Sequence, residues 1–299
     1  MIKIKRLFLE SPPASLHIIG AIYLLPSLLL YFVSEDLKFA LLLEGYSFLE
    51  SLKNIWFPSA EFLNEGGLFR PIVSTINLID YSLWGTNAFG YHLTNALVHL
   101  VNIQLVYHFS LRLFKRVDIS FLCSVIFLLH PILANSVYWI SGRTDMVACS
   151  FYLTSLMMAD KYLRGMDVKY FILSQASFLA ALLSKEVSVT LPLAQLWLIL
   201  YHRYILERDI TLKPIITRFT IFNAIMVTLF LIYRLIIFEN NPFVIDDIYN
   251  IGGIYHYFIN AIKAASFLAI PFGHHNFEAM VYEYKLYLLV ITIPIGIRV

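Results

Sequence analysis

The chain has 299 residues, of which 59% are hydrophobic and 14% charged, with a mean hydropathy of +0.73. Soluble domains carry about 25% charged residues, so this chain has too few to solvate a surface of its size, and its composition excludes a soluble globular protein. The formal net charge of +2 comes from cations spread among the loops and does not indicate nucleic-acid binding. Apolar runs recur at about the 20 residues that a helix needs to cross the hydrocarbon core, which predicts a polytopic membrane protein.

The first expected span covers residues 17–33. The residues before it, 1–6, are basic, but no small-residue cleavage site follows, so we expect this segment to stay in the membrane instead of being removed as a signal peptide. Residues 34–68 differ from a span, because six carboxylates interleave with apolar residues there. This pattern predicts amphipathic helices that lie along the membrane interface.

Apolar segments predict further spans at residues 91–114, 120–133, 146–162, 170–183, 187–204 and 215–238. A polar loop follows, and then two more apolar stretches at 254–272 and from 286 to the end of the chain. His130-Pro131 is expected to end the third span, because proline disfavours helix for the residue before it. Cys123 and Cys149 lie in apolar surroundings and predict small core side chains, not a disulfide framework.

Basic residues indicate the orientation of these spans. They occur before the first span, between the second and third, between the fourth and fifth, and between the sixth and seventh: Lys3, Lys5, Arg6, Arg112, Lys115, Arg116, Lys161, Arg164, Lys169, Arg203, Arg208, Lys213 and Arg218. Because loops rich in lysine and arginine face the cytoplasm, we expect these loops and the N-terminus there. The loops at 34–90, 134–145, 184–186 and 239–253 should then lie on the opposite side. After residue 253 the charge signal fades, and no topology is predicted.

Some cations lie on the non-cytoplasmic side, where the orientation rule does not require them: Arg70, Arg143, Lys185 and Arg234. Together they would suit a phosphate or pyrophosphate headgroup, because guanidinium and ammonium donors favour such anions. The alternative is that each is a snorkelling or ion-paired boundary residue, with Arg143 beside Asp145 and Lys185 beside Glu186. The residues alone leave both interpretations open.

The acidic pair Glu35-Asp36 follows the first span on the same side. A carboxylate there can stay partly solvated and still reach a site at the interface, where it can accept a proton from an attacking hydroxyl as a general base. The alternative is a pair of solvated interfacial charges.

A polar face opens the second span, with Tyr91 at its entry. His92, Asn95 and His99 fall at i, i+3 and i+7, so they share one face of a helix. Lipid would not tolerate that face, which should therefore point into protein or into a water-filled cavity. Two histidines seven residues apart are no metal signature without a further ligand, so polar helix–helix contacts are favoured.

In chain order, the acidic pair is followed by FRPIVSTIN, YHLTNALVH, LLHPILANSVYWISGRTD, LLSKEVSVTLP and FLAIPFGHH. This order, over residues 35–275, resembles the membrane half of the transmembrane and tetratricopeptide-repeat O-mannosyltransferases and their bacterial relatives. These belong to the GT-C class of polyprenyl-phosphate-sugar-dependent glycosyltransferases. The resemblance implies an all-α, GT-C-like helical bundle over residues 1–299 as a single domain, with interfacial helices after the first span. It also implies a polyprenyl-phosphate-linked sugar donor, with mannose one candidate, and a protein, glycan or lipid acceptor on the non-cytoplasmic side.

The resemblance, together with the cations, the polar face and the His130-Pro131 segment described above, indicates roles for residues; the family motifs themselves assign no role to Arg234, His99 or His130. The catalytic acids are Asp36 and Glu35, with Asp36 the better candidate for the base, and Arg70, Arg143, Lys185 and Arg234 would bind the donor phosphate. The expected pocket-lining residues are Tyr91, His92, Asn95, His99, His130, Asp145 and Glu186. The implied reaction inverts the anomeric carbon through an oxocarbenium-like state, with the cations stabilising the departing phosphate. No metal site is assigned, and metal dependence stays open.

Two other functions stay open, and departures from the family pattern favour one of them. Relatives commonly show two aspartates where this chain has Glu35-Asp36, and a glutamate where it has Asn135; the repeat region is absent, so we expect a short or truncated relative. An inactive membrane scaffold is therefore one alternative. A transporter or flippase for a lipid-linked or anionic solute is the other, although we detect no internal repeats or matching glycine-broken spans of the kind many transporters show. In an enzyme, Asp36 and Arg70 should share one cavity. We expect an integral membrane protein, in the inner or plasma membrane if the source is bacterial.

Overall fold

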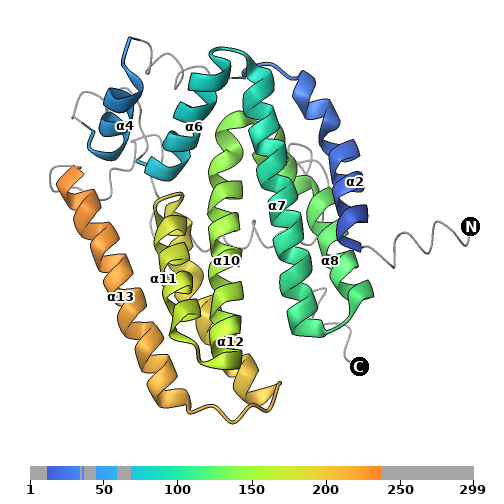
Figure 1. Ribbon diagram of the computed structural model, residues 1–299, viewed down its shortest axis with the longest axis vertical. Coiled ribbons are helices and arrows are strands. Elements are labelled where there is room, and N and C mark those ends of the chain that lie inside the picture. The colour runs from blue at the N-terminus through green and yellow to red at the C-terminus, as the bar shows by residue number, and fades with distance from the viewer. Residues whose placement is uncertain (1–11, 34–35, 37–44, 59–68, 238–299) are drawn as a thin grey trace, which may run out of the picture. The chain divides into compact units, whose positions relative to one another are not determined.

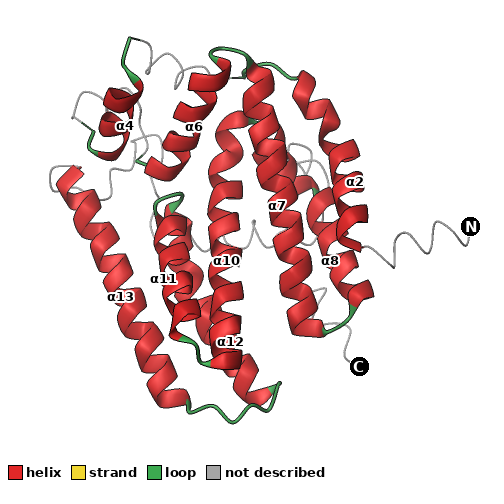
Figure 2. Cartoon of the chain, in the orientation of Figure 1, coloured by secondary structure: helices red, strands yellow, loops and turns green. Residues whose placement is uncertain are grey.

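The computed structural model describes residues 12–33, 36, 45–58 and 69–237, and within these ranges every regular element is a helix (Figure 2). The chain forms α2 (Pro12–Leu24), η1 (Leu25–Leu29), α4 (Phe48–Trp56), α6 (Pro71–Trp84), α7 (Ala88–Phe114), α8 (Val117–Leu129), η2 (Pro131–Leu133), α9 (Ala134–Tyr138), η3 (Ile140–Gly142), α10 (Arg143–Gly165), α11 (Val168–Leu182), η4 (Glu186–Thr190), α12 (Leu191–Tyr204) and α13 (Leu212–Ile237). The predicted all-α class is confirmed. The predicted segments 254–272 and 286–299, and Glu35, lie outside the described residues.

The predicted spans correspond to helices, with boundaries shifted by a few residues. The first span starts earlier than expected, at Pro12, and changes from α-helix to the 3₁₀ turn η1 where Pro26 removes a backbone donor. The third ends at Leu129, one residue before His130-Pro131, as the proline predicts. The sixth is divided into η4 and α12, because Pro192 occupies the first turn of α12.

Three helical segments are long and apolar enough to cross a membrane: Pro12–Leu29, Ala88–Phe114 and Leu212–Ile237. Shorter apolar helices, α8 and α11, accompany them. Large apolar side chains on these helices are exposed, as in Ile22, Leu122 and Ile236. Exposed apolar surface on helices of this length fits contact with lipid. The chain is a polytopic helical membrane protein.

Consecutive long helices run in alternating directions, so their ends gather into two groups (Figure 1). The start of α7, the start of α10, the end of α11 and the end of α13 lie at one end of the bundle, near α6; this end is called the acidic-pair end below, because Asp36 lies there. The connections α7–α8, α10–α11 and α12–α13 lie at the other end, and most of the cations used to predict orientation lie in them or in the flanking turns of the helices. This alternation is the arrangement that the charge pattern predicts.

Helix α10 is central to this arrangement and packs along both α11 and α7. A core cluster joins α10 to α11, α12 and α13, with Leu163, Phe178, Leu198 and Phe219 almost fully buried in it. A smaller cluster, which includes Leu16, joins α2 to α7 and α8. Packing of α10 against α11 on one side and against α7 on the other thus fixes the position of its first residues.

Helix α6 was not predicted, because its 14 residues are too few for a span and its position fell within a predicted loop. It begins at Pro71, a favoured first helical residue, after Arg70 at the N-cap. Its last residue, Trp84, lies against the first turn of α7: a Cβ on Gly90 would lie 2.0 Å from Trp84 Cγ, so glycine is needed there. This close approach sets α6 beside the polar face of α7.

Helix α4 lies in the region predicted to hold interfacial helices. Ser47 and Glu50 form a capping box at its start. Its buried side, with Ile55, packs against Leu78 of α6, while Leu49 on its other side is exposed. Glu50 and Lys53 of α4 are exposed as well, and the interfacial position of residues 34–68 stays a prediction.

Contacts divide the chain into two compact units, with residues 129–134 and 245–299 in the second. The helices that carry the site below belong to the first unit. In the second unit, His130 accepts a hydrogen bond from the Leu133 amide at its backbone carbonyl.

Candidate functional site

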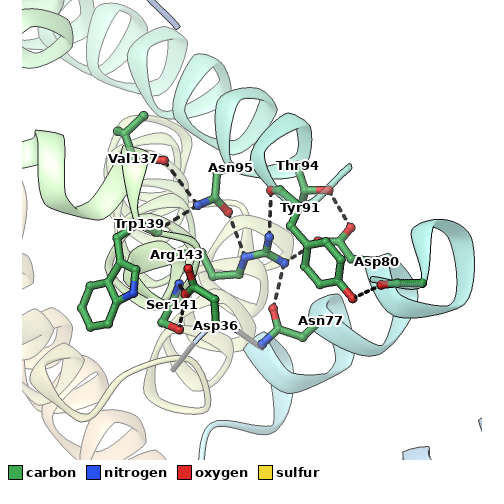
Figure 3. A network of polar contacts seen from close by, with 11 residues as sticks. Asp36, Asn77, Asp80, Tyr91, Thr94, Asn95, Val137, Trp139, Ser141 and Arg143 are labelled. Carbon is green, nitrogen blue, oxygen red and sulfur yellow. Dashed lines mark hydrogen bonds and ion pairs between the residues drawn. The ribbon is translucent and has the colours of Figure 1, made fainter. Parts of the chain in front are cut away.

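Arg143, the first residue of α10, is the most deeply buried cation among the described residues, with 1% of its surface exposed. Its Nε donates to Asn95 Oδ1 at 2.8 Å, its Nη1 to Asn77 Oδ1 at 2.8 Å and Asp80 Oδ2 at 2.5 Å, and its Nη2 to the Tyr91 carbonyl at 2.8 Å. Figure 3 shows the guanidinium held between α6 and α7 by these acceptors. A buried arginine needs such partners, because an unpaired charge in this environment is costly.

Two of these partners are themselves fixed. Asp80 Oδ1 accepts a hydrogen bond from the Thr94 hydroxyl at 2.6 Å. Asn95 uses its carbonyl for Arg143, and its amide nitrogen donates to the carbonyls of Val137 and Trp139 at 3.4 and 3.3 Å. Asn95 thus ties α7 both to α10 and to the chain just before η3.

Asp36 is buried next to this network (Figure 3). Its Oδ1 accepts from the Ser141 amide at 2.9 Å and from the Ser141 hydroxyl at 2.7 Å, and its Oδ2 accepts from the Val33 amide at 3.0 Å. Ser141 lies in η3, two residues before Arg143. The carboxylate predicted as the base is therefore held in one orientation by the turn that leads into α10.

A second cluster surrounds Glu186, the first residue of η4. Arg70 Nη2 lies 3.2 Å from Glu186 Oε2, and Arg234 Nη1 lies 3.0 Å from Glu186 Oε1. Burial alone would raise the pKa of the Glu186 carboxyl, but the two arginine charges and the hydrogen bond from Arg234 outweigh burial, so its pKa lies below the ordinary 4.5. Two cations thus share one carboxylate at the ends of α6 and α13.

The ion pairs differ from those that sequence neighbours suggested. Arg143 pairs with Asp80, not with Asp145, and Lys185 pairs with Asp145, not with Glu186. Adjacent side chains diverge from the backbone, whereas side chains on facing helix ends can meet. Arg143 and Lys185 are therefore ion-paired, but the partners expected from sequence neighbours were wrong.

The two clusters are linked through the start of α10. Ser141 is hydrogen-bonded to Asp36, Arg143 to residues of α6 and α7, and Asp145, two residues after Arg143, to Lys185. The start of α6 is also joined to the end of α11, because the Ile72 amide donates to the Leu183 carbonyl at 3.5 Å. Cations and carboxylates that are distant in sequence therefore gather at the acidic-pair end.

The polar face predicted on α7 is buried throughout: His92, Asn95 and His99 are each 1% exposed. Asn95 makes the contacts described above, and the His99 ring stacks on Phe127 with centroids 5.5 Å apart. Tyr91 is also buried, and its hydroxyl donates to the Gly85 carbonyl at 2.9 Å. The face points into protein, as predicted. Within the part of the chain that the structure describes, no group of three histidine, cysteine or acidic residues could hold a metal ion.

The structure places four residues in the network that were not predicted from the sequence: Asn77, Asp80, Thr94 and Ser141. The available signal was Asp80 itself, a carboxylate following the apolar run that starts at Ile72. A carboxylate beside apolar residues is costly to bury unless a cation or hydrogen-bond donor pairs with it. The segment is predicted as a loop, and a carboxylate in a loop needs no buried partner.

A separate polar cluster lies at the opposite end of the bundle. The fully buried Asp160 of α10 accepts from Arg112 at 2.5 Å, from Arg164 at 2.9 Å and from His202 at 2.9 Å. It joins α7, α10 and α12. This cluster neutralises part of the positive charge that indicated orientation.

Comparison with known proteins gives partial, distant matches. The chain is 28% identical over 155 residues to protein O-mannosyl-transferase F38B6.6 of Caenorhabditis elegans, covering 50% of this chain and 22% of that protein. It is 30% identical over 136 residues to human protein O-mannosyl-transferase TMTC1, covering 41% and 15%, and 28% identical over 189 residues to human TMTC2, covering 62% and 22%. No family model matches the chain, and no solved structure matches it.

The matches therefore span only 15–22% of the length of these relatives. They agree with the resemblance drawn from the motifs and with the helical membrane architecture. The chain is a polytopic membrane protein that is distantly homologous, over part of its length, to the TMTC protein O-mannosyltransferases.

Proposed function

We propose that the protein is a GT-C-type glycosyltransferase that moves a sugar, with mannose the first candidate, from a polyprenyl-phosphate donor to a hydroxyl acceptor. The reaction takes place at the acidic-pair end, which faces the non-cytoplasmic side. The observation that carries the proposal is the gathering at this end of the buried carboxylate Asp36 and the cations Arg70, Lys185 and Arg234, in a chain homologous to O-mannosyltransferases.

The cation cluster is the proposed site for the donor phosphate. Arg70, Lys185 and Arg234 carry three positive charges against the two carboxylates Asp145 and Glu186. The Arg70 Nε is buried and has no hydrogen-bond partner among the described residues. An anion with several oxygens can use such donors, and fixed cations stabilise charge on a leaving phosphate.

Arg143 takes a different part in this proposal from the phosphate-binding role expected from the sequence. Its guanidinium is buried and already bonded to Asn77, Asp80, Asn95 and Tyr91. It therefore holds the start of α10 instead of binding phosphate.

Asp36 is the proposed general base. Its carboxylate takes the proton of the acceptor hydroxyl while the hydroxyl oxygen bonds to the anomeric carbon, and the bond from that carbon to the phosphate oxygen breaks. The configuration inverts, and polyprenyl phosphate leaves. A positioned base of this kind contributes roughly 100- to 10,000-fold to a rate.

The test is a transfer assay with purified protein in lipid nanodiscs and a panel of polyprenyl-phosphate sugars. Wild type should transfer one sugar of the panel to a hydroxyl acceptor. Asp36→Asn keeps the size of the side chain but removes the basic carboxylate, so transfer should fall at least 100-fold while donor binding, measured by equilibrium dialysis, stays within about threefold.

Asp118→Asn is the matched control, because Asp118 forms an exposed ion pair with Arg116 at the opposite end. Its activity should equal that of the wild type. Full activity of Asp36→Asn would remove the aspartate from the mechanism, and no transfer by wild type from any donor in the panel would contradict the proposed function.

A further inference from the structure

We infer that Asp80 is a positioning residue for Asp36, acting through Arg143 and the turn η3. The inference rests on the proposed function for its effect on transfer, but its structural part does not. Asp80 is 3% exposed and lies on α6. It makes no hydrogen bond to η3, the turn that is hydrogen-bonded to Asp36, but it is hydrogen-bonded to Arg143, the residue that follows this turn.

The first step is the ion pair. Among the acceptors that surround the Arg143 guanidinium, Asp80 carries the negative charge, while Asn77, Asn95 and the Tyr91 carbonyl are neutral. Without the Asp80 charge, the buried guanidinium would be hydrogen-bonded only to neutral acceptors. Such a cation is expected to move toward water or to draw water in, and α10 would then lose its fixed start.

The second step is the path from Arg143 to Asp36. Only Gly142 separates Arg143 from Ser141, and the Gly142 amide donates to the Trp139 carbonyl within the same turn. The Trp139 carbonyl also accepts from Asn95, whose own carbonyl accepts from Arg143. The turn is therefore held at both ends by contacts that depend on the Arg143 position.

The third step is the carboxylate itself. Ser141 supplies two of the three hydrogen bonds that Asp36 accepts from the described residues, one from its amide and one from its hydroxyl. If η3 moves, both bonds are lost together, and the carboxylate is left with the Val33 amide. Displacement of a reacting group by about 1 Å can cost on the order of 100-fold in rate.

The first experiment needs no substrate. Carboxylates in wild type and in Asp80→Asn are labelled with a water-soluble carbodiimide and an amine, and labelling is measured at each position by mass spectrometry. Wild-type Asp36 should be protected. In Asp80→Asn, its labelling rate should rise at least fivefold, while Asp160, fully buried at the opposite end of the bundle, should stay protected.

Asp160 separates a local effect from unfolding. If Asp36 and Asp160 are labelled together, Asp80 serves only the stability of the whole fold, and the inference is overturned. If Asp36 stays protected in Asp80→Asn, it is overturned as well. Thr94→Val is a milder second variant, because it removes only the hydroxyl that donates to Asp80; it should raise Asp36 labelling less than Asp80→Asn does.

The second experiment measures transfer. Asp80→Asn should lower kcat on the order of 100-fold and leave KM for the donor within about threefold, because the proposed phosphate cluster is separate. A rise in KM with unchanged kcat would contradict a positioning role. If the wild type shows no transfer, the proposed function fails, but the labelling result still decides whether Asp80 positions Asp36.

Discussion

At the scale of single residues, Glu186 is the carboxylate whose protonation should be most visible in stability. Its folded-state pKa is lowered below 4.5, with burial opposing and the charges of Arg70 and Arg234 producing the shift. A lowered pKa means that the stabilisation is complete above pH 4.5 and is lost as pH falls through the folded-state value. Glu186→Gln should therefore melt below the wild type at pH 7, and this difference should shrink below pH 4.5.

Thermal unfolding in detergent, followed by intrinsic fluorescence between pH 7 and pH 4, checks this expectation. Asp118→Asn serves again as control, because its pair with Arg116 is exposed on both sides and such pairs contribute little. A difference between wild type and Glu186→Gln that stays constant over this range would show that the two arginines do not stabilise the carboxylate.

The polar residues that gather at the acidic-pair end were easier to predict than the contacts between them. The sequence identified Asp36, Arg70, Arg143, Lys185 and Glu186 by type and by position at span ends, and all of them take part in the polar contacts of the acidic-pair end. Their partners depend on which helix ends face each other. A linear pattern does not contain that information, so Asp80 as the partner of Arg143 had to come from the structure.

At the scale of helices, polar side chains inside the bundle tie its helices together. Ser155 of α10 and Ser174 of α11 lie 3.1 Å apart at their hydroxyls, and Gln195 of α12 donates to both. Asn223 of α13 in turn donates to the Gln195 carbonyl at 2.8 Å. Hydrogen bonds between helices of this kind are typical of membrane bundles. They account for buried polar residues that would otherwise suggest a transport pathway.

Packing in the same region supplies a prediction at this scale. Leu198 of α12 is fully buried in the cluster that joins α10 to α13, whereas Leu193 on the same helix is 71% exposed. Leu198→Ala should lower the free energy of unfolding by about 3 kcal/mol, because it leaves a cavity. Leu193→Ala should change it by less than about 0.5 kcal/mol.

Unfolding by sodium dodecyl sulfate in mixed micelles measures both variants. Equal losses for the buried and the exposed leucine would contradict the packing of α12.

The spanning helices were predictable from the length of their apolar segments, but α6 was not, since a 14-residue helix between spans has no length signal. Its Pro71 start and its apolar face were the available signs.

At the scale of the whole molecule, the alternation of helix directions predicts which loops share a side. In a background with Cys123 and Cys149 replaced by serine, Thr86→Cys and Asp209→Cys place single thiols at the two ends, since Thr86 joins α6 to α7 and Asp209 joins α12 to α13. The cytoplasmic preference of basic loops predicts that an impermeant maleimide labels Thr86→Cys in intact cells.

Asp209→Cys should be labelled only after the membrane is permeabilised. Labelling of both positions in intact cells would contradict the alternation, and the reverse pattern would place the acidic-pair end in the cytoplasm. The spacing of charges along the sequence was enough to predict which loops share an end of the bundle, because that grouping depends on local composition at each span end. The side of the membrane on which each end lies stays a prediction. The way in which α10 packs between α7 and α11 depends on contacts across the bundle, and the charge pattern could not predict it.

The most direct test of the account is a cryo-electron microscopy structure of the protein with a non-hydrolysable polyprenyl-phosphate-sugar analogue. The account predicts the phosphate within hydrogen-bond distance of Arg70, Lys185 or Arg234, with the anomeric carbon facing Asp36 and Arg143 still bonded to Asp80. A phosphate bound elsewhere in the bundle, or a sugar turned away from Asp36, would contradict it.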